Sequence, residues 1–380
     1  MTACLARNSG TESGRRTQLM AANDWAIVVG IRVYPDLTNL DGPENDANAM
    51  YAWLTAPHGG AVPVDQTALI LSSQFPPPLD GIHAEPTPID ILNAFENLQE
   101  VADHNSDAGN GRKVGRRLYI YMSGHGCAPR PKDAALLTAN ASRIRVGYHV
   151  LGKLIADWYL QSNFFDEAVL VMDCCRESYP QAPPAIPPWI DINGVKALDD
   201  ARAFCAFGTK WSRLARERVM DDGLVHGVFT WTLLQGLKTA ADASHCVTAE
   251  TLGDYLYNNM KTFLKPEDLA DPEVPKEPDI DYDKNPARPR FVFCTLPAPS
   301  PAPAAPAPQF PVTIAIPPEA AGKTVRVLGG KFQEVRRAPA VPPSWPTTLE
   351  CGTYVAQILE MGRQSDVFTV DGTGAVNVAL

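Results

Sequence analysis

Two kinds of hydrophobic pattern alternate along the first three quarters of the chain. Short, nearly continuous apolar runs are typical of strands that are buried on both faces of a parallel sheet, and segments with apolar residues at helical spacing separate most of them. The predicted strands are Trp25–Ile31, Thr67–Ser72, Arg117–Met122, Glu167–Met172, Arg202–Thr209 and Arg290–Thr295. The predicted helices are Gly42–Leu54, Thr87–Val101 (or from Asp90), Val150–Leu160, Gly227–Leu237 and Thr248–Phe263. This alternation predicts an α/β fold, in which helices cover both faces of a mainly parallel central sheet.

The pattern changes after a segment rich in proline and alanine, which should form an extended, semi-rigid linker. Beyond it, short strand-like runs are separated by Gly and Pro turns, which predicts a small, all-β, sandwich-like domain. The first residues are polar and have no apolar core, as in a flexible tail. We therefore expect a tail at 1–22, an α/β domain at 23–296, a linker at 297–309 and a β domain at 310–380.

Composition narrows the setting and the partners. The net charge of −10 and the lack of a long Lys/Arg run argue against a nucleic-acid surface and suit basic substrates. No apolar run approaches the roughly 18 residues of a membrane-spanning helix. The eight cysteines include no CxxC pair and no zinc-like spacing with histidine, so a reduced cytoplasm is the simplest expectation. We expect neither a nucleic-acid partner nor a membrane partner.

Two short motifs carry the candidate chemistry. The sequence SGHG at 123–126 follows one predicted buried strand, and DCCR at 173–176 follows the next. Reactive groups in open α/β sheets lie just past the carboxyl ends of the strands, so His125 and a cysteine 50 residues later can face each other. A thiol with a pKa near ~8.5 is mostly protonated at neutral pH, and a neighbouring imidazole can take its proton before the thiolate attacks a carbonyl.

The glycines beside the histidine suit the same chemistry. Gly124 and Gly126 let a substrate backbone approach closely and leave N–H groups that can hold an oxyanion. The two adjacent cysteines leave an alternative open, because residues that alternate along a strand point to opposite faces and only one of them can meet the histidine. Taken singly, each motif also fits ordinary buried cysteines and a structural loop histidine.

On these motifs, the part of the chain at 23–296 resembles a caspase-fold cysteine peptidase of the metacaspase and prokaryotic caspase group. The separation of 50 residues between His125 and Cys175 is also typical of caspases. The resemblance implies a caspase-like three-layer sandwich and a Cys-His dyad. It places the nucleophile at the third residue of the run that starts with Asp173, which makes Cys175 the nucleophile, His125 the base and Cys174 a neighbour.

The resemblance also implies a preference for Arg or Lys before the scissile bond. The acidic pocket of metacaspases corresponds here to Asp173 and Asp46, with Ser123 in its wall, and such a pair would clamp a guanidinium. The alternatives are that Asp46 only favours a helix N-terminus and that Asp173 is structural. Caspases that cut after Asp use arginines instead, and Arg32 or Arg176 could be mistaken for these.

Cofactors and regulation complete the expectations. We expect no cofactor and no calcium dependence, because the region 145–149 lacks the paired carboxylates of calcium-binding metacaspases; the acidic runs 221–222 and 279–283 are expected to be solvated loops. The expected partners of a monomer are protein substrates and an upstream activating protease. Proteolytic activation or self-cleavage is expected in the loops 177–200 and 210–222, at basic residues: Lys196, Arg202, Lys210, Arg213, Arg216 and Arg218.

Other functions remain open at this stage. A catalytically silent caspase-like scaffold would keep the fold, and a different thiol hydrolase could use a flavodoxin-like sheet. A role in defence or programmed death rests on family analogy alone.

Overall fold

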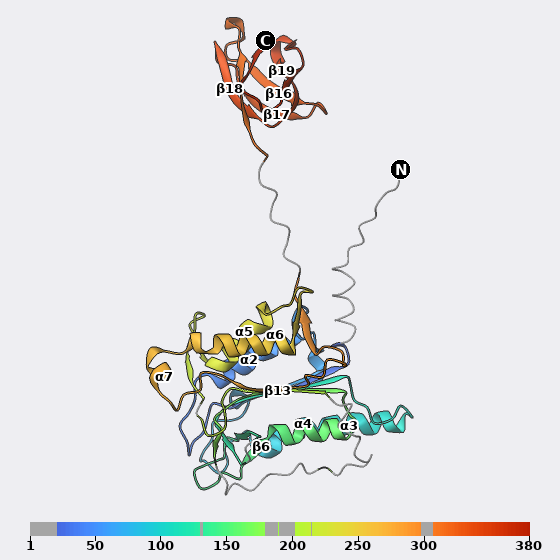
Figure 1. Ribbon diagram of the computed structural model, residues 1–380, viewed down its shortest axis with the longest axis vertical. Helices are drawn as coiled ribbons and strands as arrows, with labels where there is room; N and C mark the ends of the chain where they lie inside the picture. Colours follow the sequence, from blue (N-terminus) through green and yellow to red (C-terminus); the bar gives the residue numbers. More distant parts are fainter. Residues whose placement is uncertain (1–20, 130–131, 179–188, 190–201, 214, 298–306) are drawn as a thin grey trace. The chain divides into compact units, whose positions relative to one another are not determined.

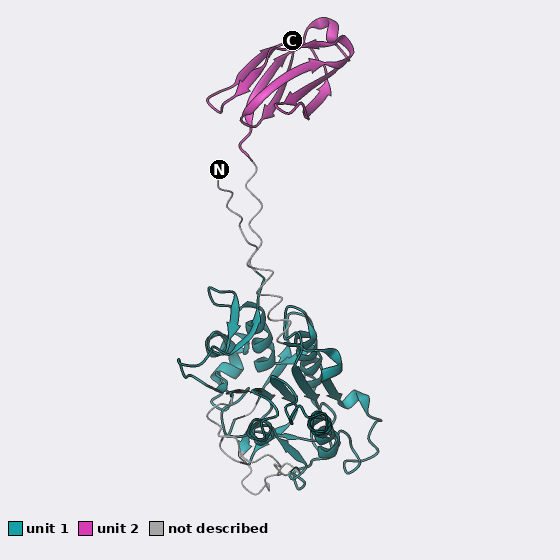
Figure 2. Ribbon diagram, turned by 90° about the vertical axis from the view of Figure 1, so that its right-hand side faces the viewer, with its two compact units in different colours: residues 1–298 teal, residues 299–380 magenta. Residues whose placement is uncertain are grey.

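The computed structural model (Figure 1) describes residues 21–129, 132–178, 189, 202–213, 215–297 and 307–380. The chain divides into two compact units, residues 1–298 and 299–380, which are coloured separately in Figure 2. Each unit has its own hydrophobic core.

A six-stranded sheet forms the centre of the first unit, in the order β13-β9-β7-β3-β1-β2. Its strands are β1 (Asp24–Gly30), β2 (Thr67–Leu71), β3 (Arg117–Ser123), β7 (Glu167–Asp173), β9 (Arg202–Phe207) and β13 (Asp279–Tyr282). All neighbours pair in parallel except β13, which runs antiparallel to β9 at one edge. The predicted fold class is thereby confirmed as a mixed, mainly parallel sheet of an α/β unit.

Helices cover both faces of this sheet (Figure 1). One face carries α3 (Pro88–Asp107) and α4 (Gly152–Gln161), and the other carries α2 (Pro43–Thr55), α5 (Val228–Thr239) and α6 (Ala249–Asn259). A short helix, α7 (Pro266–Ala270), follows.

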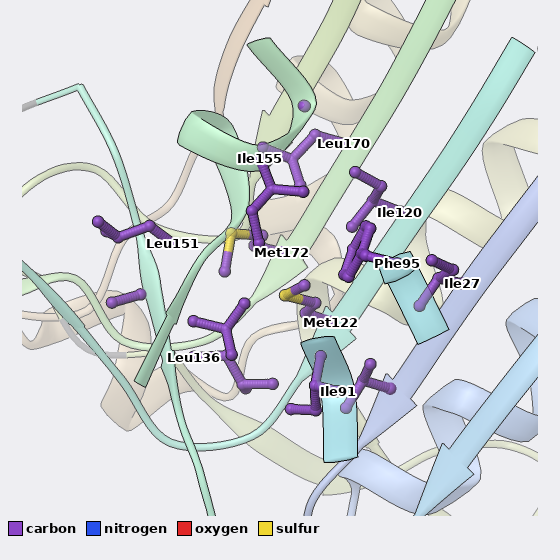
Figure 3. Packing of buried hydrophobic residues seen from close by; sticks show 14 of the residues in the cluster. Ile27, Ile91, Phe95, Ile120, Met122, Leu136, Leu151, Ile155, Leu170 and Met172 are labelled. Atoms are coloured by element: carbon purple, nitrogen blue, oxygen red, sulfur yellow. The ribbon is translucent and has the colours of Figure 1, made fainter. Parts of the chain in front are cut away.

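Alternate strand residues supply the two cores between these layers. Ile120 of β3 lies beside Phe95 of α3, and Leu170 of β7 lies beside Ile155 of α4 (Figure 3). Their chain neighbours Tyr121 and Val171 face the opposite helices. Because both faces are covered, β3 and β7 are buried along their whole length, which explains their continuous apolar sequences.

The helix predicted at 87–101 ends later than expected, because α3 continues to Asp107. Its N-terminus is fixed by a capping box, in which the carboxylate of Asp90 accepts from the N–H and the hydroxyl of Thr87 at 2.7 Å. The last turns are polar and exposed, so they leave no apolar periodicity in the sequence.

Several short strands gave no signal in the sequence. They are β4 (Gly126–Ala128), β5 (Ala135–Leu137), β6 (His149–Leu151), β8 (Glu177–Ser178), β10 (Glu217–Val219), β11 (Val225–Gly227) and β12 (Cys246–Thr248). The predicted strand at 290–295 is β14 (Val292–Thr295), and it pairs with β12 outside the central sheet. The acidic run at 279–283 was expected to be a loop, but most of it forms the edge strand β13. Backbone pairing with β9 stabilises this strand although its sequence has few apolar residues.

The second unit is an all-β sandwich. One sheet has the order β18-β15-β22, and the other has the order β17-β16-β19-β20 with β21 paired to β19. The strands are β15 (Phe310–Ala315), β16 (Thr324–Gly329), β17 (Glu334–Pro339), β18 (Ser344–Leu349), β19 (Gly352–Ile358), β20 (Arg363–Gln364), β21 (Phe368–Val370) and β22 (Val376–Ala379). Ile314 from one sheet and Val325 from the other are fully buried in a common core.

Candidate active site

The carboxyl ends of three neighbouring strands meet at one level. Gly30 of β1 pairs with Ser123 of β3, and Ser123 pairs with Asp173 of β7, so the segments that follow these strands lie side by side. A cavity of about 170 Å³ opens there. It is lined by Leu40, Pro43, Asp46, Ser123, Gly124, His125, Asp173, Cys175, Ala215, Arg216, Glu217 and Gly227. The structure therefore brings together the candidate residues Asp46, Ser123, Gly124, His125, Asp173 and Cys175.

The imidazole of His125 is held by the segment that follows β1. Its Nε2 atom lies 2.7 Å from the carbonyl oxygen of Thr38, and a carbonyl can only accept, so Nε2 carries the proton. In the neutral ring, Nδ1 is then the atom with a free lone pair. The ring also packs edge-on against Tyr34 at a centroid distance of 4.7 Å.

Tyr34 supports the same loop through its hydroxyl. This hydroxyl accepts from the N–H of His125 and donates to the carbonyl of Leu137, both at 3.0 Å. Burial raises the pKa of Tyr34 well above its ordinary value, so the hydroxyl stays protonated and the second bond is kept. The ring and backbone of His125 thus have fixed positions before any substrate binds.

The two cysteines diverge as strand alternation requires. Cys174 is 1% exposed and belongs to the core under α3 and α4, whereas Cys175 lines the cavity with His125. Burial raises the pKa of the Cys175 thiol, and the hydrogen bond from the N–H of Ala215 to its Sγ atom, 3.3 Å long, only partly opposes this. A thiol in this environment stays protonated near neutral pH, so it needs a base for nucleophilic attack.

The glycines beside His125 differ in what they can offer. The N–H of Gly124 donates to the carbonyl of Asp173 at 3.3 Å, so the expectation that this group is free for an oxyanion was wrong. A Cβ atom at Gly126 would lie 2.6 Å from both the Sγ atom of Cys174 and the carbonyl oxygen of Cys175. Gly126 therefore lies directly against the cysteine segment, where a side chain would not fit.

Two buried carboxylates form the floor of the cavity. Asp173 accepts from the N–H of Thr230 at 3.0 Å and from its hydroxyl at 2.7 Å. Asp46, from the first turn of α2, accepts from the N–H of Gly227 at 2.9 Å. Burial raises the pKa of Asp46 to about 7 and that of Asp173 to about 6. Carboxylates in such an environment gain from a cation that enters and pairs with them.

Gly227 makes this floor possible. A Cβ atom at this position would lie 2.1 Å from one Asp173 oxygen and 3.0 Å from one Asp46 oxygen. The backbone of Gly227 is otherwise ordinary, with φ −62° and ψ 132°. The glycine is therefore required by space and not by backbone conformation.

Two acidic or titratable residues of the site were missed by the sequence analysis. Glu217 lines the cavity, and its carboxylate accepts from the N–H groups of Gly42 at 2.9 Å and Asp41 at 3.2 Å, at the start of α2. His226 lies behind Asp46, with Nδ1 2.7 Å from an Asp46 oxygen. Both come from a charged stretch whose pattern does not reveal that it folds back onto residues about 180 positions earlier.

The arginines considered for an Asp-binding pocket lie elsewhere. Arg176 is 0% exposed and does not line the cavity. Its guanidinium donates to the carbonyls of Asp133 at 3.2 Å and Thr209 at 3.1 Å and to the carboxylate of Asp279 at 2.5 Å. Arg32 is also absent from the cavity lining. Arg216 does line the cavity, and its guanidinium lies 3.4 Å from the carboxylates of Asp268 and Asp271.

Comparison with known proteins identifies the family. The family model described as the caspase domain matches residues 23–268. The chain belongs to the caspase-domain family. Membership implies a cysteine peptidase domain.

Individual relatives of this caspase domain are distant. A probable protease from a Desulfuromonadales bacterium is 25% identical over 244 residues, which are 58% of this chain and 26% of the relative, so the match spans about a quarter of that protein. The crystal structure of caspase-1 from Spodoptera frugiperda has a TM-score of 0.46 at 10% identity, covering 73% of this chain and 92% of that one. For pro-sf-caspase-1 the TM-score is 0.39 at 10% identity, with coverages of 74% and 94%.

The remaining expectations for the caspase domain concern metals and loops. Within the described residues, no group of three or more His, Cys, Asp or Glu side chains is arranged to hold a metal ion. The same part of the chain contains no helix that is both long and apolar enough to cross a membrane. Lys196 and most of the loop 177–200 lie outside the described residues.

Proposed function

We propose that this protein is a cysteine endopeptidase that cleaves after Arg or Lys with a Cys175–His125 dyad. The observation that carries the proposal is the cavity in which both dyad residues share a lining with the buried carboxylates Asp46 and Asp173. The nucleophile and an acidic floor in one cavity fit a substrate whose basic side chain points inward while its carbonyl faces the thiol.

The dyad would act by ordinary acid–base and nucleophilic steps. Nδ1 of His125 takes the proton of the Cys175 thiol, and the thiolate attacks the carbonyl carbon of the scissile bond. The tetrahedral oxyanion is held by backbone N–H donors, for which Gly126 is the candidate of the two glycines. His125 then gives its proton to the leaving amine, and water hydrolyses the thioester to release the acid and the free thiol.

Preference for a basic residue follows from the floor of the cavity. A guanidinium or ammonium group placed between Asp46 and Asp173 would replace water with two charge-assisted hydrogen-bonding partners. Ser123, which is buried beside Asp173 in the strand register, adds a hydroxyl to the wall. A substrate with Asp at this position would instead bring a third negative charge into a buried acidic site, which is strongly unfavourable.

Regulation by proteolysis is part of the proposal. The basic residues of the segment 210–218 are partnered by acids of the segment 268–277: Lys210 with Glu277 at 2.8 Å, and Arg213 with Glu273 at 2.7 Å. Exposed pairs of this kind contribute only about 0–1 kcal/mol each, so they do not protect the segment from a protease. Cleavage here by the protein itself or by an upstream protease would convert a zymogen of a cytoplasmic defence or cell-death pathway, as family analogy suggests.

The C-terminal β unit is proposed to serve docking or autoinhibition. Among the residues that the structure describes, the cores of the first unit contain none beyond Leu296, so a chain that ends at 298 should remain folded. A shortened chain with altered peptidase activity or partner binding would support this role. Unchanged activity and unchanged binding would contradict it.

Hydrolysis of fluorogenic peptides that end in Arg, Lys or Asp tests the main proposal. We expect cleavage after Arg or Lys that is lost in Cys175→Ala and does not depend on calcium. Cleavage after Asp, or cleavage that survives Cys175→Ala, would contradict the proposal. If the full chain cleaves none of the peptides either before or after limited proteolysis, the silent scaffold becomes the better account.

A further inference from the structure

A buried histidine lies directly behind the acidic floor of the cavity. The side chain of His226, in β11, is 3% exposed. Its Nδ1 atom lies 2.7 Å from one oxygen of Asp46, and its Nε2 atom lies 3.0 Å from one oxygen of Asp222. One face of the imidazole packs against Trp231 of α5, at a centroid distance of 5.3 Å. The ring is thus fixed between two carboxylates by contacts from three elements.

The two short contacts bear on the charge of this ring. When both carboxyls are ionised, a neutral imidazole, which has only one N–H, would face one of them with a lone pair on each side. An imidazolium donates to both carboxylates. Asp222 is itself held as a carboxylate, because the N–H of Leu224 donates to it and lowers its pKa. The geometry therefore fits a positively charged His226.

The charged and titratable groups around this ring are mainly acidic. Asp46 belongs to α2, and Asp222 belongs to the turn between β10 and β11. Across that hairpin, the backbone partner of His226 is Arg218, whose guanidinium donates to the carbonyl of Phe263 at 2.5 Å. On the far side of Asp46 lie further groups that interact with it electrostatically, Asp173 and Tyr121. His226 is the cation in direct hydrogen-bond contact with Asp46 among the described residues.

We propose that His226 is a specificity-determining positioning residue, whose imidazolium keeps Asp46 ionised and oriented at the floor of the cavity. This inference rests on the proposed preference for Arg or Lys. It means that recognition of a basic side chain is controlled by a histidine other than His125. The acid required for recognition is thus made available by a neighbour that never touches the substrate.

The burial of Asp46 explains why such a neighbour is needed. Asp46 is 1% exposed, and a buried carboxyl without a cation takes up a proton and becomes neutral. Burial already raises the pKa of Asp46 to about 7, although the hydrogen bond to His226 lowers it. For His226, burial lowers the pKa, but the contacts with Asp46 and Asp222 outweigh this and raise it. Loss of the imidazolium would raise the pKa of Asp46 further, so a smaller fraction of it would be ionised at pH 7 and able to bind a guanidinium.

The kinetic test removes the charge at position 226 but keeps a hydrogen-bond donor there. Glutamine in His226→Gln can still donate to Asp46 but carries no charge, and His104→Gln, at an exposed site on α3, is the matched control. We expect His226→Gln to raise KM for an Arg peptide about fivefold at pH 7, with kcat within about twofold, because an upward shift of one unit from a pKa of about 7 lowers the ionised fraction of Asp46 from about one half to about one eleventh. As the pH is lowered, the affinity of His226→Gln for the Arg peptide should begin to fall at a pH about one unit higher than that of the wild type. A peptide that ends in neutral citrulline should respond to neither change.

A measurement of the ring itself keeps the inference separate from the proposed activity. In protein labelled with ¹⁵N at histidine, we expect NMR to show both ring nitrogens of His226 protonated at pH 7, and only one after Asp46→Asn. A neutral His226 in the wild type at pH 7 would overturn the inference, as would a folded His226→Gln protein with unchanged KM for the Arg peptide. If the wild type cleaves no Arg peptide, the proposed function fails. Binding of agmatine at pH 7, about fivefold weaker in His226→Gln, then supports the inference, and equal binding overturns it.

Discussion

The backbone N–H of Ala215 points at the Sγ atom of Cys175 across 3.3 Å. Two residues further on, Glu217 accepts hydrogen bonds from the N–H groups that precede α2. The segment that contacts Cys175 is therefore the same one that is attached to the start of the helix carrying Asp46. Displacement of this segment would disturb the thiol and the acidic floor together.

Replacement by alanine should have different effects at the two adjacent cysteines. Cys175→Ala should lower kcat/KM for an Arg peptide by on the order of 10³-fold or more, because it removes the nucleophile. Cys174→Ala should leave most of this activity and cost stability instead, because Cys174 is part of the core. Peptide hydrolysis and thermal unfolding of both variants check this. Greater loss of activity in Cys174→Ala would reverse the assignment of the nucleophile.

The buried carboxyl of Asp173 should lower the free energy of unfolding at neutral pH. The pKa of Asp173 is raised by burial to about 6, so the folded state binds a proton more tightly than the unfolded state does. Stability contributed by Asp173 is therefore greatest at low pH and is lost as the pH rises from about 4 to about 6. Asp173→Asn should remove this penalty and raise the free energy of unfolding at pH 7 by about 1–3 kcal/mol. The same variant should lose preference for Arg peptides.

Denaturant unfolding of Asp173→Asn at several pH values checks the sign. The gain relative to the wild type should vanish below about pH 3, where both folded and unfolded carboxyls are protonated. Destabilisation at pH 7 would mean instead that the ionised carboxylate is needed by the hydroxyl and N–H of Thr230.

A substitution at Gly227 should act only by filling the space next to the two buried carboxylates. Gly227→Ala should strongly reduce cleavage of Arg peptides, because the new methyl group would displace the carboxylate of Asp173. Gly253→Ala is the matched control: Gly253 lies in α6, and its added Cβ atom would make an ordinary contact of 3.5 Å with Tyr282. Activity of Gly227→Ala close to that of the control would show that the floor can move aside without loss of recognition.

A substitution of Arg176 should change the position of Cys175, although Arg176 itself does not line the cavity. Arg176→Lys should lower both kcat and the melting temperature, because an ammonium group cannot replace the fork that reaches two carbonyls and Asp279. Arg32→Lys is the control, since Arg32 does not line the cavity. Steady-state kinetics and thermal melts of the two variants check this. If Arg176→Lys changed KM alone, Arg176 would act on substrate binding and not on the position of Cys175.

The sequence predicted the sheet and the candidates at its edge better than the contacts between distant segments. His125 and Cys175 directly follow apolar strands, so their meeting follows from strand order. The divergence of Cys174 and Cys175 continues the alternation of β7 just past its end, where Cys174 joins the same core as Leu170 and Met172. Asp46 entered through family resemblance, because nothing in the local sequence relates the first turn of a helix to strands that come later.

The parts that could not be predicted depend on tertiary contacts. The hairpin of β10 and β11 has strands of three residues each, too short for a periodic pattern. Its residues Glu217 and His226 reach α2 through contacts across about 180 positions. The acidic strand β13 lacks the apolar alternation of a buried strand, because it lies at the edge of the sheet.

The hydrogen bonds of the Arg176 guanidinium also have a consequence for synthesis on the ribosome. One hydrogen bond of the Arg176 guanidinium goes to Asp279, which lies 103 residues later in the chain. Synthesis therefore delivers His125 and Cys175 well before the carboxylate that contacts the residue next to Cys175. In an unfinished chain, this part of the cavity wall is still without the contact that joins it to the edge strand β13.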